Sequence, residues 1–144
     1  MEDQHPALGI DHGDARIGLA ITDPIGILAH PLETIHVQQT PPLERINTLI
    51  SQRLVKQIII GLPYRMDGSE GTAAAKIRDF AEELEKSLVS PLPITFIDER
   101  LTTVSAAQKL HAAGKNARKQ KGLIDQAAAV EILSDWLNQQ TPMH

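Results

Sequence analysis

The sequence predicts an α/β fold, in which a mixed five-stranded sheet (three antiparallel strands, then two parallel) carries helices on both faces. Short β-type segments separated by turn residues open the chain. Two later apolar strands each follow a segment with helical periodicity. The 144 residues suit one domain, which we expect to span 1–144 with an ordered core of about residues 6–138.

The opening segments indicate an antiparallel meander. Residues 7–11 are expected to form a strand that ends at an acid, and residues 16–23 to form a second strand after a turn. Residues 27–37 are expected to form the third strand, where Pro31 indicates an edge strand or an irregularity.

Helices and parallel strands then alternate. A helix is expected from Pro41 or Pro42 onward, and the apolar run at residues 57–61 suits a strand buried on both faces. Ser69 is expected to cap a second helix, whose apolar stripe ends at Leu88. Residues 94–98 are expected to form the fifth strand.

The last third is expected to be helical. Thr102 is a candidate cap for a helix that runs to about Ala113, and residues 115–121 are interpreted as a polar, basic linker before a final helix over residues 123–137. In that last helix Trp136 is expected to be part of the core. The whole order of elements is that of the ribonuclease-H-like fold, whereas a flavodoxin-like fold would lack the opening meander.

Acidic residues stand at three points of this expected fold. Asp11 ends the first strand, Asp98 and Glu99 end the fifth, and Asp125 shares a helix face with small and apolar residues. Strand alternation sends the side chains of Asp98 and Glu99 to opposite faces, so that only one of them easily joins Asp11. Each acid also has a structural alternative to a functional role. Asp11 could be a turn residue, Asp125 could cap the last helix, and Asp98 and Glu99 could be solvated acids that pair with Arg100.

A cation would explain why such acids converge. Like charges brought together raise one another's pKa, and a bound cation removes that cost. Oxygen-only ligands suit Mg²⁺ or Mn²⁺, and two such ions can activate water and stabilise the leaving oxygen in phosphodiester cleavage.

Four motifs resemble those of the YqgF family and occur in that family's order. They are Gly9-Ile10-Asp11-His12-Gly13-Asp14-Ala15-Arg16-Ile17-Gly18, Gly61-Leu62-Pro63 with Asp67-Gly68-Ser69, Asp98-Glu99-Arg100-Leu101-Thr102-Thr103, and Ile124-Asp125-Gln126-Ala127-Ala128-Ala129 with Ile132-Leu133. The resemblance implies a ribonuclease-H-like nuclease related to Holliday junction resolvases, with a role in maturing the 5′ end of 16S ribosomal RNA. It also implies that Asp11, Glu99 and Asp125 are the catalytic, metal-binding acids, with Asp98 as second choice to Glu99.

The expected partner is nucleic acid, either pre-16S ribosomal RNA or branched DNA, recognised through its backbone. Low aromatic content (3%) argues against a base-stacking platform. Either a monomer or a homodimer is consistent with the sequence. Two alternatives stay open: a Holliday junction resolvase, and a non-catalytic module that binds transcription or ribosome-assembly machinery. A fourth possibility, the phosphate-binding half of an actin-like ATPase, is opposed by the chain length, because those enzymes bind nucleotide between two such domains. Candidate phosphate contacts are Arg16, Arg65, Arg100, Lys115, Arg118, Lys119 and Lys121.

Composition bounds these expectations. The net charge of −4 argues against a protein that simply coats nucleic acid. The absence of cysteine excludes disulfides and thiolate metal sites. We expect a cytoplasmic protein without membrane contact, because no apolar run is long enough to cross a bilayer and the first residues do not resemble a secretory signal.

Overall fold

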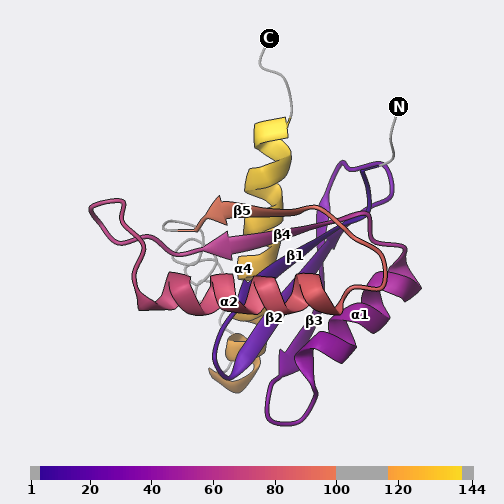
Figure 1. Ribbon diagram of the computed structural model, residues 1–144. Coiled ribbons are helices and arrows are strands. Elements are labelled where there is room, and N and C mark those ends of the chain that lie inside the picture. The colour runs from indigo at the N-terminus through magenta and orange to yellow at the C-terminus, as the bar shows by residue number, and fades with distance from the viewer. Residues whose placement is uncertain (1–3, 100–116, 141–144) are drawn as a thin grey trace.

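The computed structural model describes residues 4–99 and 117–140. Its elements are β1 (Ala7–His12), β2 (Arg16–Thr22), β3 (Ala29–His36), α1 (Pro42–Arg53), β4 (Gln57–Leu62), α2 (Thr72–Ser87), β5 (Ile94–Asp98) and α4 (Ala117–Gln140) (Figure 1). Among these helices, none is long and apolar enough to span a membrane. The predicted helix from Thr102 to Ala113 lies outside the described residues.

The five strands form one mixed sheet in the order β3-β2-β1-β4-β5. The β1–β2 and β2–β3 pairs are antiparallel, whereas β4 runs parallel to both β1 and β5. β1 therefore lies in the middle of the sheet. β3 is an edge strand whose register shifts opposite Leu19 and Ala20, where Pro31 pairs with Ala20, so the interpretation of Pro31 is confirmed.

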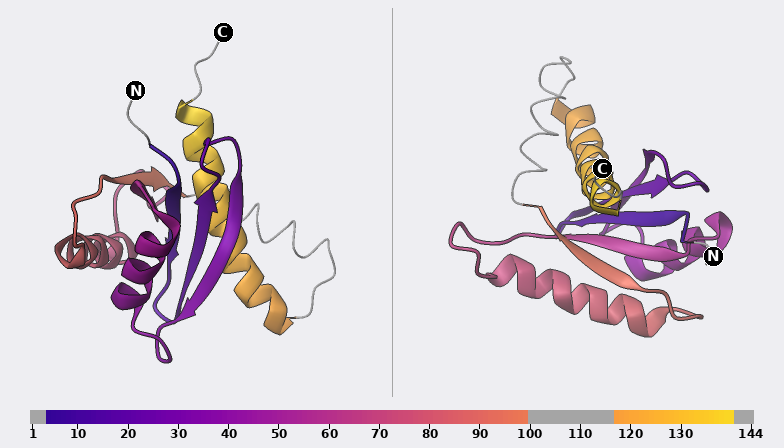
Figure 2. Two further views of the ribbon diagram at one scale, coloured as in Figure 1. Left: turned by 90° about the vertical axis from the view of Figure 1, so that its right-hand side faces the viewer. Right: turned by 90° about the horizontal axis from the view of Figure 1, so that it is seen from above.

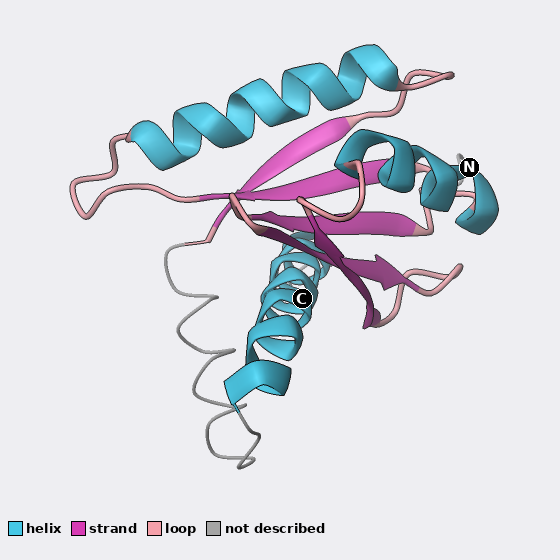
Figure 3. Cartoon of the chain, turned by 90° about the horizontal axis from the view of Figure 1, so that it is seen from below, coloured by secondary structure: helices cyan, strands magenta, loops and turns pink. Residues whose placement is uncertain are grey.

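Helices cover the two faces of the sheet separately. α1 and α2 lie on one face and α4 crosses the other (Figures 2 and 3). Strand alternation divides β4 between them: Ile58 and Ile60 join the cluster under α1 and α2, while Ile59 joins the cluster under α4. This explains why an unbroken apolar run suits an interior strand.

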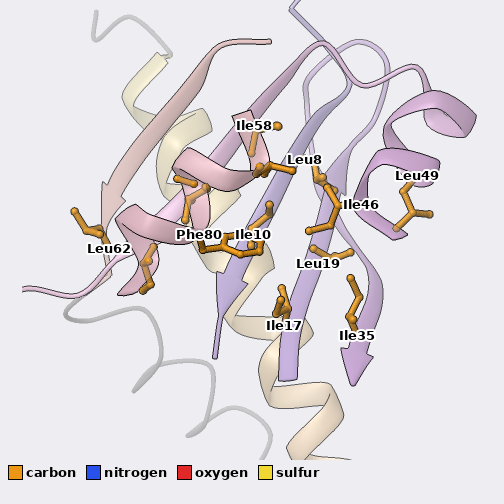
Figure 4. Packing of buried hydrophobic residues seen from close by; sticks show 14 of the residues in the cluster. Leu8, Ile10, Ile17, Leu19, Ile35, Ile46, Leu49, Ile58, Leu62 and Phe80 are labelled. Atoms are coloured by element: carbon orange, nitrogen blue, oxygen red, sulfur yellow. The ribbon is translucent and has the colours of Figure 1, made fainter. Parts of the chain in front are cut away.

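The larger apolar cluster lies between the sheet and helices α1 and α2 (Figure 4). Ile46 of α1 and Leu84 of α2 are fully buried there, because apolar residues recur along one side of each helix. The α4 face contains a smaller cluster in which Trp136 is buried, so its predicted place in the core is confirmed.

Two local predictions are wrong. Ser69 does not cap α2, which begins at Thr72 after an N-cap at Gly71; the Ser69 hydroxyl instead donates to the Asp67 carboxylate at 2.6 Å. The basic segment is not a linker throughout, because α4 already begins at Ala117. Residues 118–121 are all polar in sequence (Arg-Lys-Gln-Lys), so no apolar periodicity marks the beginning of the helix.

Candidate functional site

Asp11 lies near the carboxyl end of the central strand. Its register partner is Gly18 on β2, and alternation from Ala7 places its side chain on the face that α4 covers. Burial raises the pKa of the half-buried Asp11 carboxyl; a hydrogen bond with Glu99 opposes this rise, and the charge of Asp125 adds to it. Because Asp11 lies within β1, the alternative that it is a turn residue is wrong.

Glu99 continues β5 by one residue. Its N–H donates to the carbonyl oxygen of Leu62 at 3.2 Å, which extends the parallel pairing with β4. Glu99 is on the same face as Ile97, which packs under α4, whereas Asp98 is exposed on the opposite side. Alternation thus brings Glu99, and not Asp98, to Asp11.

The Asp11 and Glu99 carboxyls share a hydrogen bond, which requires a proton between them. Burial raises the pKa of Glu99 to about 8, with further increases from the Asp11 charge, the hydrogen bond to Asp11 and the Asp98 charge. Glu99 is therefore the protonated member at neutral pH, and it donates to the Asp11 carboxylate.

Asp125 approaches the same place from α4. It is the ninth residue of that helix, so a helix-cap role is excluded. The Nε–H of Arg16 donates to Asp125 Oδ2 at 2.7 Å. The charge of Asp125 reaches Asp11 strongly enough to raise its pKa, so all three acids belong to one electrostatic neighbourhood.

Glycines under α4 allow this approach. A Cβ at Gly18 would collide with the backbone carbonyl of Asp125, so only glycine lets the helix lie this close to β2. A Cβ at Gly61 would meet Ile132 and, at 2.7 Å, Glu99 Oε2. The motif glycines thus make room for two of the acids.

A divalent cation fits the Asp11–Glu99 pair. Two adjacent half-buried carboxyls ionise together only if positive charge replaces the shared proton, and hard oxygen ligands suit Mg²⁺ or Mn²⁺. Within residues 4–99 and 117–140, no group of three or more metal-ligating side chains is preassembled. The Asp125 carboxylate is bonded to Arg16, so this acid is near the pair but not yet part of a three-acid cluster.

The predicted phosphate contacts are distributed unevenly. Arg16 pairs with Asp125, and Arg65 is exposed in the loop between β4 and α2. Arg118, Lys119 and Lys121 are in the first turns of α4, for which the structure describes the backbone alone. Arg100 and Lys115 lie outside the described residues.

The sequence did not single out two residues beside the acids. His12 and Lys76 line a cavity of about 420 Å³ that Glu99 also lines. The His12 ring packs on Phe80 with a centroid separation of 4.4 Å, and burial lowers the pKa of His12. Alternation after Asp11 would have placed His12 on the α2 face, but the position of Lys76 depends on how α2 docks.

Comparisons with known proteins agree with this architecture. Residues 5–139 match the model of a family described as "RuvX: Holliday junction resolvase". The chain is 46% identical over 132 residues to a Cutibacterium acnes protein named "Putative pre-16S rRNA nuclease", covering 92% of this chain and 81% of that protein. A Mycobacterium ulcerans protein of the same name is 47% identical over 133 residues, covering 92% and 78% of the two chains.

Solved structures show the same fold at low sequence identity. Thermus thermophilus RuvC in complex with a Holliday junction substrate has a TM-score of 0.56 and 14% identity, covering 94% of this chain and 96% of that chain. This likeness confirms the predicted ribonuclease-H-like fold.

Proposed function

The chain belongs to the RuvX family of Holliday junction resolvase-like proteins, which is the YqgF family that its four motifs resemble. From this membership we propose that the protein is a nuclease that hydrolyses phosphodiester bonds in structured RNA. The substrate that we favour is the 5′ region of pre-16S ribosomal RNA, since the relatives at 46% and 47% identity are named for it. Residues 1–144 would form one nuclease domain acting in the cytoplasm.

The observation that carries the proposal is the Asp11–Glu99 pair at the ends of two strands that α4 crosses. Two adjacent, half-buried carboxyls are costly for a protein that merely binds a partner, because burial raises the pKa of both and the Asp11 charge raises the pKa of Glu99 further. Their cost is explained if they hold a divalent cation, Mg²⁺ or Mn²⁺, with Asp125 as a third ligand, in a site of the two-metal type.

The chain's own residues prepare the site for that cation. Glu99 and Asp11 would hold it as two ionised carboxylates once their shared proton is released to solvent. Arg16 keeps Asp125 close to the pair, and release from Arg16 would let that carboxylate join them. A cation held there would supply two kinds of chemistry: it would lower the pKa of the attacking water and stabilise the leaving oxygen.

Cleavage of a 5′-extended 16S precursor in Mg²⁺ or Mn²⁺ tests this proposal. We expect Asp11→Asn and Glu99→Gln each to slow cleavage about 100-fold or more, because each removes a metal ligand. Asp98→Asn is the matched control: it removes the neighbouring charge from the opposite face and should cleave at nearly the wild-type rate. Unchanged cleavage by Asp11→Asn would contradict the mechanism.

A DNA junction resolvase is the second candidate, favoured by the family description and by the junction-bound RuvC structure. Resolution needs two active sites, one for each strand, and hence a dimer. Cleavage of a four-way DNA junction by a stable homodimer, faster than cleavage of the RNA precursor, would favour this alternative.

A further inference from the structure

The cavity of about 420 Å³ beside the acids is unexplained by the cation site alone. The cavity lies at the carboxyl ends of β1 and β4, against the first turns of α2. Figure 1 shows these first turns of α2 on the same side of the molecule as the arrowheads of β4 and β5. Its volume is within the usual range of small-ligand pockets, roughly 300–1,000 Å³. Lining residues include His12, Asp14, Pro63, Thr72, Lys76 and Glu99.

Glu99 connects this cavity to the proposed reaction centre. Its carboxyl is hydrogen-bonded to Asp11 on the α4 side of the sheet, yet Glu99 also forms part of the cavity wall toward α2. A group bound in the cavity would therefore lie next to the cleaved phosphate, on the side away from Arg16 and Asp125.

Lys76 is the positively charged residue of the cavity lining. Its ammonium is 3.4 Å from Asp14 Oδ2, and both side chains are largely exposed, at 61% and 78%. Such an exposed and long ion pair is worth little in water. An anion entering the cavity can displace Asp14 from Lys76 at small cost.

Two further lining residues, His12 and Thr72, can contact a sugar–phosphate backbone. The His12 ring packs on Phe80 at an interplanar angle of 38°, and Thr72, whose side chain carries a hydroxyl group, also lines the cavity. Most contacts between such proteins and nucleic acid go to phosphate and sugar, and lysine and threonine are typical donors to phosphate oxygens.

We infer that this cavity binds the backbone phosphate next to the one that is cleaved, and that Lys76 is the residue that positions it. The inference rests on the proposed function and extends it: the strand would run from the cavity on the α2 side, across Asp11 and Glu99, toward Arg16 on the α4 side.

Equilibrium binding tests the inference independently of cleavage. Fluorescence anisotropy with the 5′-extended precursor RNA is measured in the Asp11→Asn background, where the RNA should stay intact. We expect Lys76→Ala to weaken binding about fivefold and to lower the slope of log affinity against log salt by about one. The matched control is Lys86→Ala, which removes another lysine of α2 paired in an exposed ion pair, with Glu82.

Asp14→Asn separates phosphate binding from a merely structural ion pair. If Lys76 binds phosphate, removing the competing Asp14 carboxylate leaves RNA affinity unchanged or improves it. Equal affinities of Lys76→Ala and Lys86→Ala would overturn the inference, and so would an Asp14→Asn variant weakened as much as Lys76→Ala. Failure of the proposed function has a different signature, namely equal cleavage by Asp11→Asn and wild type whatever stands at position 76.

Discussion

The two faces of the sheet are packed in different ways. Under α1 and α2, large aliphatic side chains such as Leu8, Ile10 and Ile58 fill the space between sheet and helices. Under α4, the sheet presents glycine and alanine at Gly9, Gly18 and other positions, and the helix backbone comes close to the strands. This second face also holds the carboxyls.

That difference separates two tasks. A face filled by large side chains keeps a helix at a distance but contributes much apolar burial. A face of small residues contributes less, yet it lets α4 bring Asp125 into the electrostatic neighbourhood of Asp11. We therefore expect changes in the apolar interior under α1 and α2 to affect stability and changes under α4 to affect catalysis.

The largest effect on stability is expected on the α1–α2 face. Ile46→Ala removes a fully buried side chain from α1 and should lower the free energy of unfolding by about 2–5 kcal/mol. Cleavage per folded molecule should stay close to wild type, because α1 does not contact the acids. Urea unfolding and single-turnover cleavage measure the two quantities, and a large loss of rate per folded molecule would break the division between faces.

The next effect is expected under α4. In Gly18→Ala the added methyl collides with the Asp125 backbone, so the helix must shift, at a cost of about 1–3 kcal/mol. Cleavage should fall by more than this loss of stability explains, since Asp125 moves with the helix.

Gly9→Ala is the matched control for that change. Its methyl would meet Leu133 Cγ at 2.5 Å and the Ala129 carbonyl oxygen at 3.1 Å, one helical turn from Asp125, whereas the methyl at position 18 collides with the Asp125 backbone itself. If Gly9→Ala and Gly18→Ala lower the cleavage rate equally, close packing near Asp125 has no special importance.

The contrast between the faces also decides what the sequence could predict. Alternating and continuous apolar patterns predicted all five strands and the interior position of β4, because they record which side of a strand is covered. Alternation also separated Asp98 from Glu99. Alternation alone could not decide which of the two acids joins Asp11. That depends on which face of the sheet α4 covers, and this is set by the tertiary packing.

Long-range contacts were the part that sequence reasoning missed. The sequence indicates Arg16 as a candidate phosphate contact, and its pairing with Asp125 joins residues 109 positions apart. Lys76 and Glu99 come to line one cavity only through the docking of α2 on the sheet. Ser69 was misassigned because Asp67 competes for its hydroxyl within the loop.

A smaller effect is expected from pH. The pKa of Glu99 is about 8 in the folded protein against 4.5 for the ordinary residue. Between these values the unfolded chain loses a proton that the folded chain keeps, so stability of the metal-free protein falls as pH rises, by at most about 1.4 kcal/mol per pH unit.

Urea unfolding in EDTA from pH 5 to 8 checks this slope. Glu99→Gln should flatten it, whereas Glu83→Gln, which changes an exposed residue of α2, should not. Adding Mn²⁺ should reverse the trend, because the ionised pair then gains its cation. An identical slope in Glu99→Gln and wild type would show that this carboxyl does not titrate as described.

The smallest effect on stability is expected at Arg16. Its ion pair with Asp125 is partly exposed, and Arg16→Gln should lower the free energy of unfolding by about 0.2–1 kcal/mol. Affinity for Mn²⁺ should rise up to about fivefold, because the variant removes a positive charge that competes with the cation for Asp125 Oδ2.

Arg45→Gln is the matched control. Arg45 is equally exposed, at 34%, and pairs with Glu33 away from the acids, so its loss should cost similar stability and leave Mn²⁺ affinity unchanged. Calorimetric titration with Mn²⁺ distinguishes the two variants. Weaker Mn²⁺ binding by Arg16→Gln would mean that Arg16 orients Asp125 for the cation instead of competing with it.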